Sequence, residues 1–468
     1  MKNFFSCILI EKKKGDLDMT RSNSKEKMTG NYLKILRYSF FATLTLLSTS
    51  AVNLTDAYFI SKLGSDATAA VGVAFAVQFF IQAVGFTVGM GGGSLLSRAL
   101  GAKEEKIGNQ IVTIALLMSV AVGILIALLG ILHINRLLPL LGANESIYSL
   151  SKEYLRLLLL SAPWIIFSLV LSQLLRAAGN AAFSMIGFVT GGATNLLLTP
   201  LFLFVFDLGI AGAGYAMMIG YVASCLLLLI FTFSKRSVIK PTRIQKSSSL
   251  QKSWKILLTG LPSFCRHGFS GLATIILNNL GKSIGTEAIA AITIVSRVSL
   301  LSLSFCTGIG QGMIPVAGYH YGANDIEGVR RSYRFSLLLS SVLMLVISIP
   351  VFAFAPQLVG LFRHEPEIVD IATTALRAQS AVFVLHGTIT ATTMLLQTVG
   401  RTIASTTLAC ARQGIFFLPL IFLIPQYFRF IQSIADVLTF LLTLFFISHY
   451  KWWRKSNRKR MPSNADRI

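Results

Sequence analysis

A row of polar side chains that ends in a carboxylate is the feature of this sequence best suited to chemistry. Intervals of four, four and three residues place its members on one face of a helix: Thr45, Thr49, Asn53 and Asp56. The surrounding segment is apolar, and a carboxylate in apolar surroundings can take up a proton near neutral pH. We therefore predict that Asp56 binds a coupling ion. The alternative is a carboxylate that only ends its helix at an aqueous interface.

A second row of small and polar residues lies about 140 positions further along. Its members are Ser184, Gly191, Asn195 and Thr199, and Pro200 follows directly. A proline inside a helix removes one backbone hydrogen bond and frees a carbonyl oxygen, so we expect a kink at Pro200. If the two rows face each other, Asp56, Asn195 and Thr199 form one polar pocket that offers oxygen ligands to H+ or Na+.

The apolar segments of the second half carry mainly basic and amide side chains, whereas those of the first half carry the carboxylate of Asp56. We predict that a substrate cavity is lined by Thr49, Asn53, Gln173, Arg266, His267, His386 and Gln397. Buried polar groups also pair across helix interfaces, which is the alternative for the histidines and amides. Asp436 is expected to be structural, and Arg297 and Arg412 to bridge helices or reach the membrane surface.

The composition excludes a soluble protein. Of the 468 residues 54% are hydrophobic and 13% are charged, whereas soluble domains carry about 25% charged residues. The apolar residues extend over most of the chain, which indicates a polytopic membrane protein. The net charge of +23 therefore points to the membrane surface rather than to nucleic acid. Neither a catalytic nucleophile with its partners nor a phosphate-binding loop is present, so we expect no enzyme and no ATP use.

Twelve segments are apolar enough to cross a membrane as helices. They cover approximately 36–60, 70–96, 110–132, 154–176, 183–206 and 209–233, then 255–280, 288–314, 333–353, 371–398, 402–425 and 428–449. They predict two six-helix lobes, 36–233 and 255–449, with a lead at 1–35, a linker at 234–254 and a basic tail at 450–468. Most of the 42 Lys and Arg residues fall in the two ends, the linker and alternate loops. The positive-inside rule then places both termini in the cytoplasm of a cell-membrane protein.

The two halves match each other at an offset of 221 residues. Residues 63–70 resemble 284–291, and 101–102 are repeated at 322–323. Gly89 falls on Gly310, and Gly179 on Gly400. Each half has an even number of spans, so the repeats are parallel, an arrangement found in secondary transporters that move two bundles around a central site.

The motifs of this chain resemble those of the multidrug and toxic compound extrusion (MATE) transporters. The similarity covers about residues 31–450, and the segments that carry it are 53–64, 69–72, 85–92, 97–102, 175–180, 310–323 and 412–419. The resemblance implies two six-helix lobes around a V-shaped cavity. It also implies export of bulky, often cationic amphiphiles, driven by inward H+ or Na+.

In the bacterial DinF-like branch of this family, an aspartate at the position of Asp56 is central to coupling, and an asparagine matches Asn195. A second aspartate usually stands where this chain has Thr199. A relay of two acids is therefore absent from the first lobe, and Thr199 is carried over only as an oxygen ligand or hydrogen-bond partner.

We thus predict an all-helical antiporter for organic cations or drugs, acting as a monomer in the lipid bilayer, without a cofactor other than its coupling ion. The alternative is a flippase for a lipid-linked sugar or a related lipid, in which Arg266, Arg297 and His386 hold a phosphate.

Overall fold

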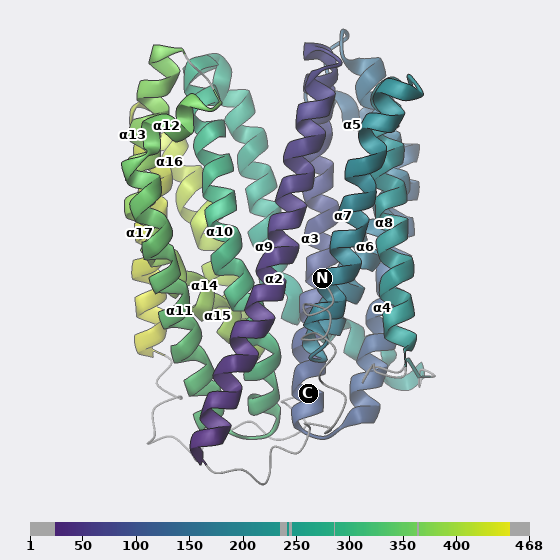
Figure 1. Cartoon of the computed structure of the whole chain (residues 1–468), viewed down its shortest axis with the longest axis vertical. Coiled ribbons are helices and arrows are strands. Elements are labelled where there is room, and N and C mark those ends of the chain that lie inside the picture. The colour runs from purple at the N-terminus through teal and green to yellow at the C-terminus, as the bar shows by residue number, and fades with distance from the viewer. Residues whose placement is uncertain (1–23, 235–240, 243–245, 285, 363–364, 450–468) are drawn as a thin grey trace, which may run out of the picture.

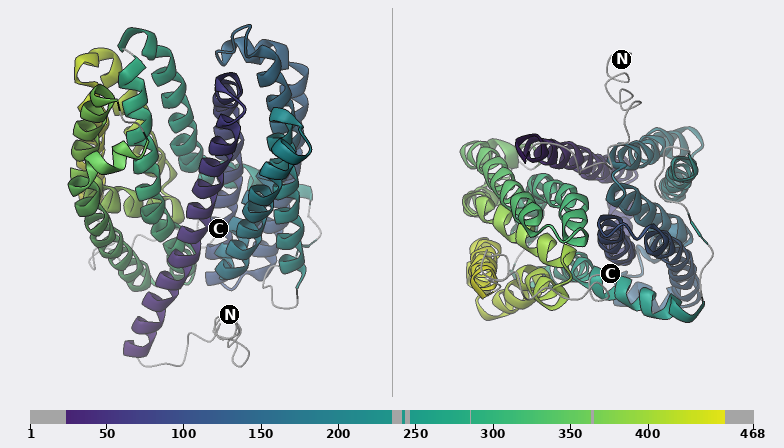
Figure 2. Two further views of the ribbon diagram at one scale, coloured as in Figure 1. Left: turned by 45° about the horizontal axis from the view of Figure 1, so that its top comes forward. Right: turned by 90° about the horizontal axis from the view of Figure 1, so that it is seen from below.

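The computed structural model describes residues 24–234, 241–242, 246–284, 286–362 and 365–449. The first 23 residues of the predicted lead, residues 235–240 and 243–245 of the linker and the whole basic tail lie outside them. Within the described residues the chain is helical, and it forms two lobes that stand side by side (Figure 1 and Figure 2). The predicted fold class, an all-α membrane protein with two lobes, is confirmed.

The N-terminal lobe contains six long helices and two short elements. They are α2 (Ser24–Ser61), α3 (Ser65–Gly101), α4 (Glu105–Leu132), α5 (Ile134–Leu140), α6 (Tyr148–Ala177), α7 (Ala181–Pro200), η1 (Leu201–Val205) and α8 (Gly209–Phe233). Helix α6 is the most buried span and packs against α3, α4 and α8, so it forms the centre of this lobe.

The C-terminal lobe repeats this plan with more interruptions. Its elements are α9 (Lys246–Ile284), α10 (Thr286–Gly322), α11 (Ile326–Ala353), α12 (Ala355–Gly360), α13 (Pro366–Ala381), α14 (Phe383–Thr398), α15 (Thr402–Cys410), η2 (Ala411–Phe417), α16 (Leu418–Leu423), η3 (Pro425–Tyr427) and α17 (Phe428–His449). Helices α13 and α14 meet at 52°, where one straight span was predicted over 371–398. Helix α9 begins at Lys246, inside the predicted linker.

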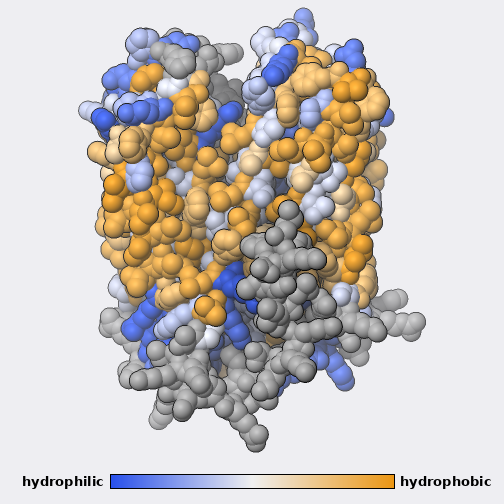
Figure 3. Space-filling model, in the orientation of Figure 1, coloured by the Kyte–Doolittle hydropathy of each residue, from blue (hydrophilic) through white to orange (hydrophobic). Residues whose placement is uncertain are grey.

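The helices have the length and composition of membrane spans. In the described part of the chain ten are long and apolar enough to cross a bilayer, and the bent pair α13 and α14 adds an eleventh. The twelfth predicted span is α9, which carries Lys252, Lys255, Arg266 and His267 and falls short of that apolar composition. The surface shows the matching pattern, an apolar belt at mid-height with polar residues at both ends (Figure 3).

The backbone confirms the internal repeat. At the ends of α3 and α10, Lys103 and Asn324 share the left-handed conformation, with φ of 61° and 62°. At the ends of α6 and α14, Gly179 and Gly400 share it with φ of 88° and 81°. Both pairs are 221 residues apart, so equivalent helices end in equivalent caps.

In the described part of the chain, the closest glycine contacts between the lobes lie in one half of the molecule, an interface we call the glycine seam. A β-carbon at any of its members would collide with a residue of the other lobe, and these members are Gly91, Gly101, Gly260, Gly308, Gly312, Gly318 and Gly322. Gly101 packs on Tyr319 while Gly322 packs on Arg98, and each of these contacts maps onto the other at the same offset. The pseudo-twofold axis therefore runs between α3 and α10. The seam lies at the ends of these helices that carry the predicted cytoplasmic loops.

Polar groups close the same end of the molecule. Arg98 donates from Nε to the carbonyl oxygen of Thr398 at 2.5 Å and from Nη2 to that of Gln397 at 2.9 Å. His320 of α10 lies 3.0 Å from the Asn31 amide nitrogen of α2 and 2.9 Å from the Asp325 carboxylate. The hydrogen bond from His320 lowers the pKa of Asp325 to about 2, so Asp325 is ionised at neutral pH.

Substituting a seam glycine should force the lobes apart at this end. Gly260 faces the backbone of Thr87, so we expect Gly260→Val to favour the conformation in which the lobes are separated at the glycine seam. Spin labels at Lys106 and Ile403, in a chain without its native cysteines, should report a longer distance than in the parent. Gly268→Val on the same helix is the control, because only the Phe264 ring edge lies near, at 3.8 Å. Equal distances in all three proteins would contradict the expectation.

Candidate functional site

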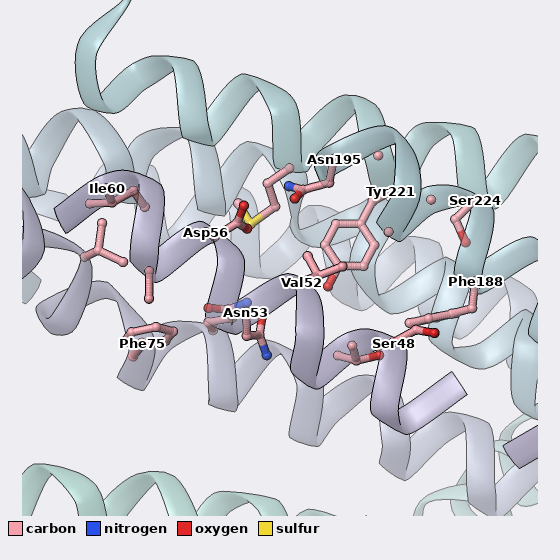
Figure 4. A pocket seen from close by; sticks show the side chains of 18 of the residues that line it. Ser48, Val52, Asn53, Asp56, Ile60, Phe75, Phe188, Asn195, Tyr221 and Ser224 are labelled. Carbon is pink, nitrogen blue, oxygen red and sulfur yellow. The ribbon is translucent and has the colours of Figure 1, made fainter. Parts of the chain in front are cut away.

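A pocket lies inside the N-terminal lobe and is lined by one carboxylate, that of Asp56 (Figure 4). It is enclosed by α2, α3, α6, α7 and α8. Thr199 donates from Oγ1 to Asp56 Oδ1 at 3.1 Å and to the carbonyl oxygen of Asn195 at 3.0 Å. The two polar rows of the sequence therefore do face each other. Since Thr199 is fully buried and Asp56 lies against it, the carboxylate has limited access to water.

Asn195 lies beside Asp56 and Thr199 and offers a side-chain oxygen that accepts no hydrogen bond among the described residues. Its side chain is 4% exposed and lines the pocket. Close contact between Gly191 of α7 and Gly220 of α8 brings the two helix backbones together beside it. Asp56 and Asn195 thus line the pocket with a carboxylate and a free amide oxygen, and the Thr199 hydroxyl lies against the carboxylate. This set suits a proton or a small hard cation.

Helix α7 ends at Pro200, and the chain continues as the π-helical segment η1. The proline was predicted to kink the span. Residues Ala181–Val205 are continuous in one span, and the hydrogen-bond pattern changes directly after Pro200, at the position of the predicted kink. Single π-helical turns within spans are frequent at functional sites.

The pocket adjoins a second, larger cavity between the lobes. The two share residues Asn53, Ala57, Ile60, Val71 and Phe75. The walls of the larger cavity come from α2, α3 and α10 and are mostly apolar. All of its lining residues lie in the halves of these helices remote from the glycine seam. The molecule is therefore open at the end opposite its basic loops, which is the predicted V-shaped arrangement.

The predicted cavity residues fall into two groups. Thr49 lines the inner pocket and Asn53 lines both cavities. The other five line neither of these cavities: Gln173, Arg266, His267, His386 and Gln397. Gln173 is buried against Gly89, and Gln397 donates to the carbonyl oxygen of Thr259 at 3.0 Å within the closed end. Both amides pack between helices, the alternative that the sequence left open.

The basic residues of the second half are dispersed. Arg266 donates to the sulfur of Met90 at 3.5 Å, and the ring of His267 stacks on Phe86 at 4.4 Å. Arg297 alone among the three residues expected to hold a phosphate lines the large cavity. The arrangement required for a lipid phosphate held jointly by Arg266, Arg297 and His386 is therefore not formed in this conformation.

His386 belongs instead to a buried ionic cluster around Asp436. Asp436 is fully buried, and its carboxylate accepts from Gln379 at 2.6 Å and Arg412 at 2.7 Å and lies 2.9 Å from His386 Nε2. Gln379 and His386 stand on either side of the bend between α13 and α14, and Arg412 lies in η2. The cluster thus ties two interrupted spans, α13–α14 and α15–η2–α16, to α17, in agreement with the structural role expected for Asp436 and the bridging role expected for Arg412.

Sequence reasoning did not select several pocket residues. Gln78, Tyr154 and Tyr221 line the pocket beside Asp56. Each has a polar group at the end of its side chain and lies in an apolar span, and this is the feature by which it could have been predicted. None of them belongs to a row of polar residues on one helix face. Arg98 was also not selected, although it sits in a motif that carries the family resemblance and closes the seam.

Comparisons with known proteins agree with this architecture. The MatE family model matches residues 42–201 and 268–423. The multidrug export protein MepA of Staphylococcus aureus is 28% identical over 386 residues, covering 82% of this chain and 85% of that protein. Its counterpart in Staphylococcus saprophyticus is 26% identical, covering 79% and 82%. A solved MATE family transporter in an outward-facing conformation has a TM-score of 0.85 at 24% identity, covering 93% of this chain and all of that one.

Proposed function

Because the chain belongs to the MatE family of multidrug and toxic compound extrusion transporters, we propose that it exports bulky, cationic organic compounds in exchange for inward H+ or Na+. Members of this family are transporters rather than enzymes. Export of drugs also accords with the relatives, which are named multidrug export proteins.

The observation that carries the proposal is the single carboxylate in a pocket that adjoins the large cavity. A cationic amphiphile enters the apolar cavity between the lobes and is attracted by the charge of Asp56. Entry of a proton or Na+ from outside neutralises that charge, so the compound leaves through the open end. The lobes then close at that end and part at the glycine seam, which exposes the pocket to the other side of the membrane.

The orientation follows from charge. The basic loops lie at the closed end, so we place this end and both termini in the cytoplasm of a cell-membrane protein that acts as a monomer. The conformation described here then faces outward. It is the state in which Asp56 receives its ion.

The proposal is tested with inverted membrane vesicles and the cationic dye ethidium. A pH gradient and a Na+ gradient are imposed separately, and dye accumulation is followed by fluorescence. We expect accumulation with one of the two gradients and none after an ionophore collapses it. Absence of gradient-dependent dye movement, with the protein present and folded, would contradict the proposed function.

A further inference from the structure

The large cavity carries a positive charge of its own, which export of simple cations does not explain. Arg297 lies on α10 and lines the cavity with its side chain exposed. It stands eleven residues into a helix that begins at Thr286, which is about 16 Å from that end at 1.5 Å per residue. A guanidinium this far from the helix end faces the cavity instead of the membrane surface.

Arg297 lines the large cavity without a carboxylate partner, whereas several other arginines of the spans are bound by neighbouring groups. Among the described residues, no carboxylate lies within ion-pair distance of its guanidinium. Arg412 pairs with Asp436, Arg98 donates to two carbonyl oxygens, and Arg377 lies over the ring of Phe352 at 5.8 Å. An unpaired charge within membrane depth is costly and points to a ligand or a water-filled path.

The two charges that line the adjoining cavities come from opposite lobes. Asp56 lines the pocket of the N-terminal lobe, and Arg297 lines the wall contributed by the C-terminal lobe. The residues between them, such as Phe75 and Ile60, belong to both cavities and are apolar. A ligand that fills the space thus meets an acidic group, an apolar stretch and a basic group in order.

We propose that Arg297 is an anion-binding subsite and that the exported compounds include zwitterionic amphiphiles. This inference rests on the proposed efflux function and specifies its substrate class. The cationic group of such a compound faces Asp56, its aromatic body contacts the apolar wall, and its carboxylate pairs with Arg297. The planar guanidinium fits a carboxylate through two parallel hydrogen bonds.

The test uses two dyes that differ in one carboxylate. Rhodamine B carries a cationic ring system and a free carboxylate, and its ethyl ester carries the cation alone. Gradient-driven transport of each is measured in proteoliposomes that contain the parent protein, Arg297→Gln, Arg297→Lys or Arg377→Gln. Arg377→Gln is the matched control, because it removes an arginine of the same lobe that lies outside the cavity.

We expect Arg297→Gln to lower transport of rhodamine B about tenfold, corresponding to about 1.4 kcal/mol, and to change transport of the ester less than twofold. Arg297→Lys keeps the charge but loses the two parallel hydrogen bonds, so it should retain only part of the rhodamine B transport. Unchanged transport of the ester by both Arg297 variants shows that the loss does not come from misfolding. Equal effects on both dyes would overturn the inference. Transport of the ester alone by the parent would overturn it and leave the efflux function intact, whereas transport of neither dye would overturn both.

Discussion

Replacing Asp56 with asparagine is expected to lower gradient-driven efflux on the order of 100-fold, which corresponds to about 2.7 kcal/mol. The amide keeps the size of the side chain and still accepts from Thr199, which lies 3.1 Å away. It carries no charge in either state, so ion entry no longer changes the attraction for a cationic compound. The measurement is the initial rate of dye accumulation in inverted vesicles.

The matched control for this variant is Asp66→Asn. Asp66 is an exposed carboxylate in the first turn of α3, at the open end of the molecule, and it lines neither cavity. We expect unchanged transport in this variant. If Asp56→Asn transports as fast as the parent at equal protein level, coupling does not depend on this carboxylate.

The second large effect is expected on stability, at Asp436. Replacing it with alanine leaves the guanidinium of Arg412 and the ring of His386 without the carboxylate that they contact at 2.7 and 2.9 Å. Removing one partner of a buried ion pair costs about 3–5 kcal/mol, because the other charge stays buried and unpaired. The unfolding midpoint of the purified protein in detergent should fall accordingly.

Two further variants separate charge from packing. Asp436→Ala combined with Arg412→Gln should recover part of the lost stability, because the lone charge is removed. Asp370→Asn breaks the exposed pair with Arg429, whose groups are 3.2 Å apart, and should change stability by less than about 1 kcal/mol. If Asp436→Ala unfolds like the parent but no longer transports, the cluster acts in transport rather than in stability.

The sequence was sufficient to predict the spans, the duplication and the pocket around Asp56. The spans follow from the apolar composition of each segment, and the duplication follows from the constant offset between matching residues. The rows Thr45–Asp56 and Ser184–Thr199 were predicted to form a polar pocket on the condition that they face each other, and the hydrogen bond from Thr199 to Asp56 shows that they do. Their roles in ion coupling remain predictions.

The positions of His386 and Gln397 were not predictable in the same way. Both lie on the polar face of one span, and periodicity says only that such a face avoids lipid. Whether it meets a cavity or another helix depends on tertiary packing. Here α14 turns this face to Asp436 of α17 and to Thr259 of α9. The bend at Val382 could not be predicted either, because no proline or glycine stands next to it in the sequence.

The glycine seam also bears on how fast the molecule can change its conformation. Most tight interfaces hold interlocked side chains, which must leave their rotamers before the surfaces separate. In the seam, much of the contact is between backbones: Gly260 lies on Thr87, Gly101 on Tyr319 and Gly322 on Arg98. Smooth surfaces of this kind separate and rejoin with little rearrangement of side chains. We therefore expect the rate of opening to depend mainly on the polar contacts between the lobes, such as those of Arg98, His320 and Arg176.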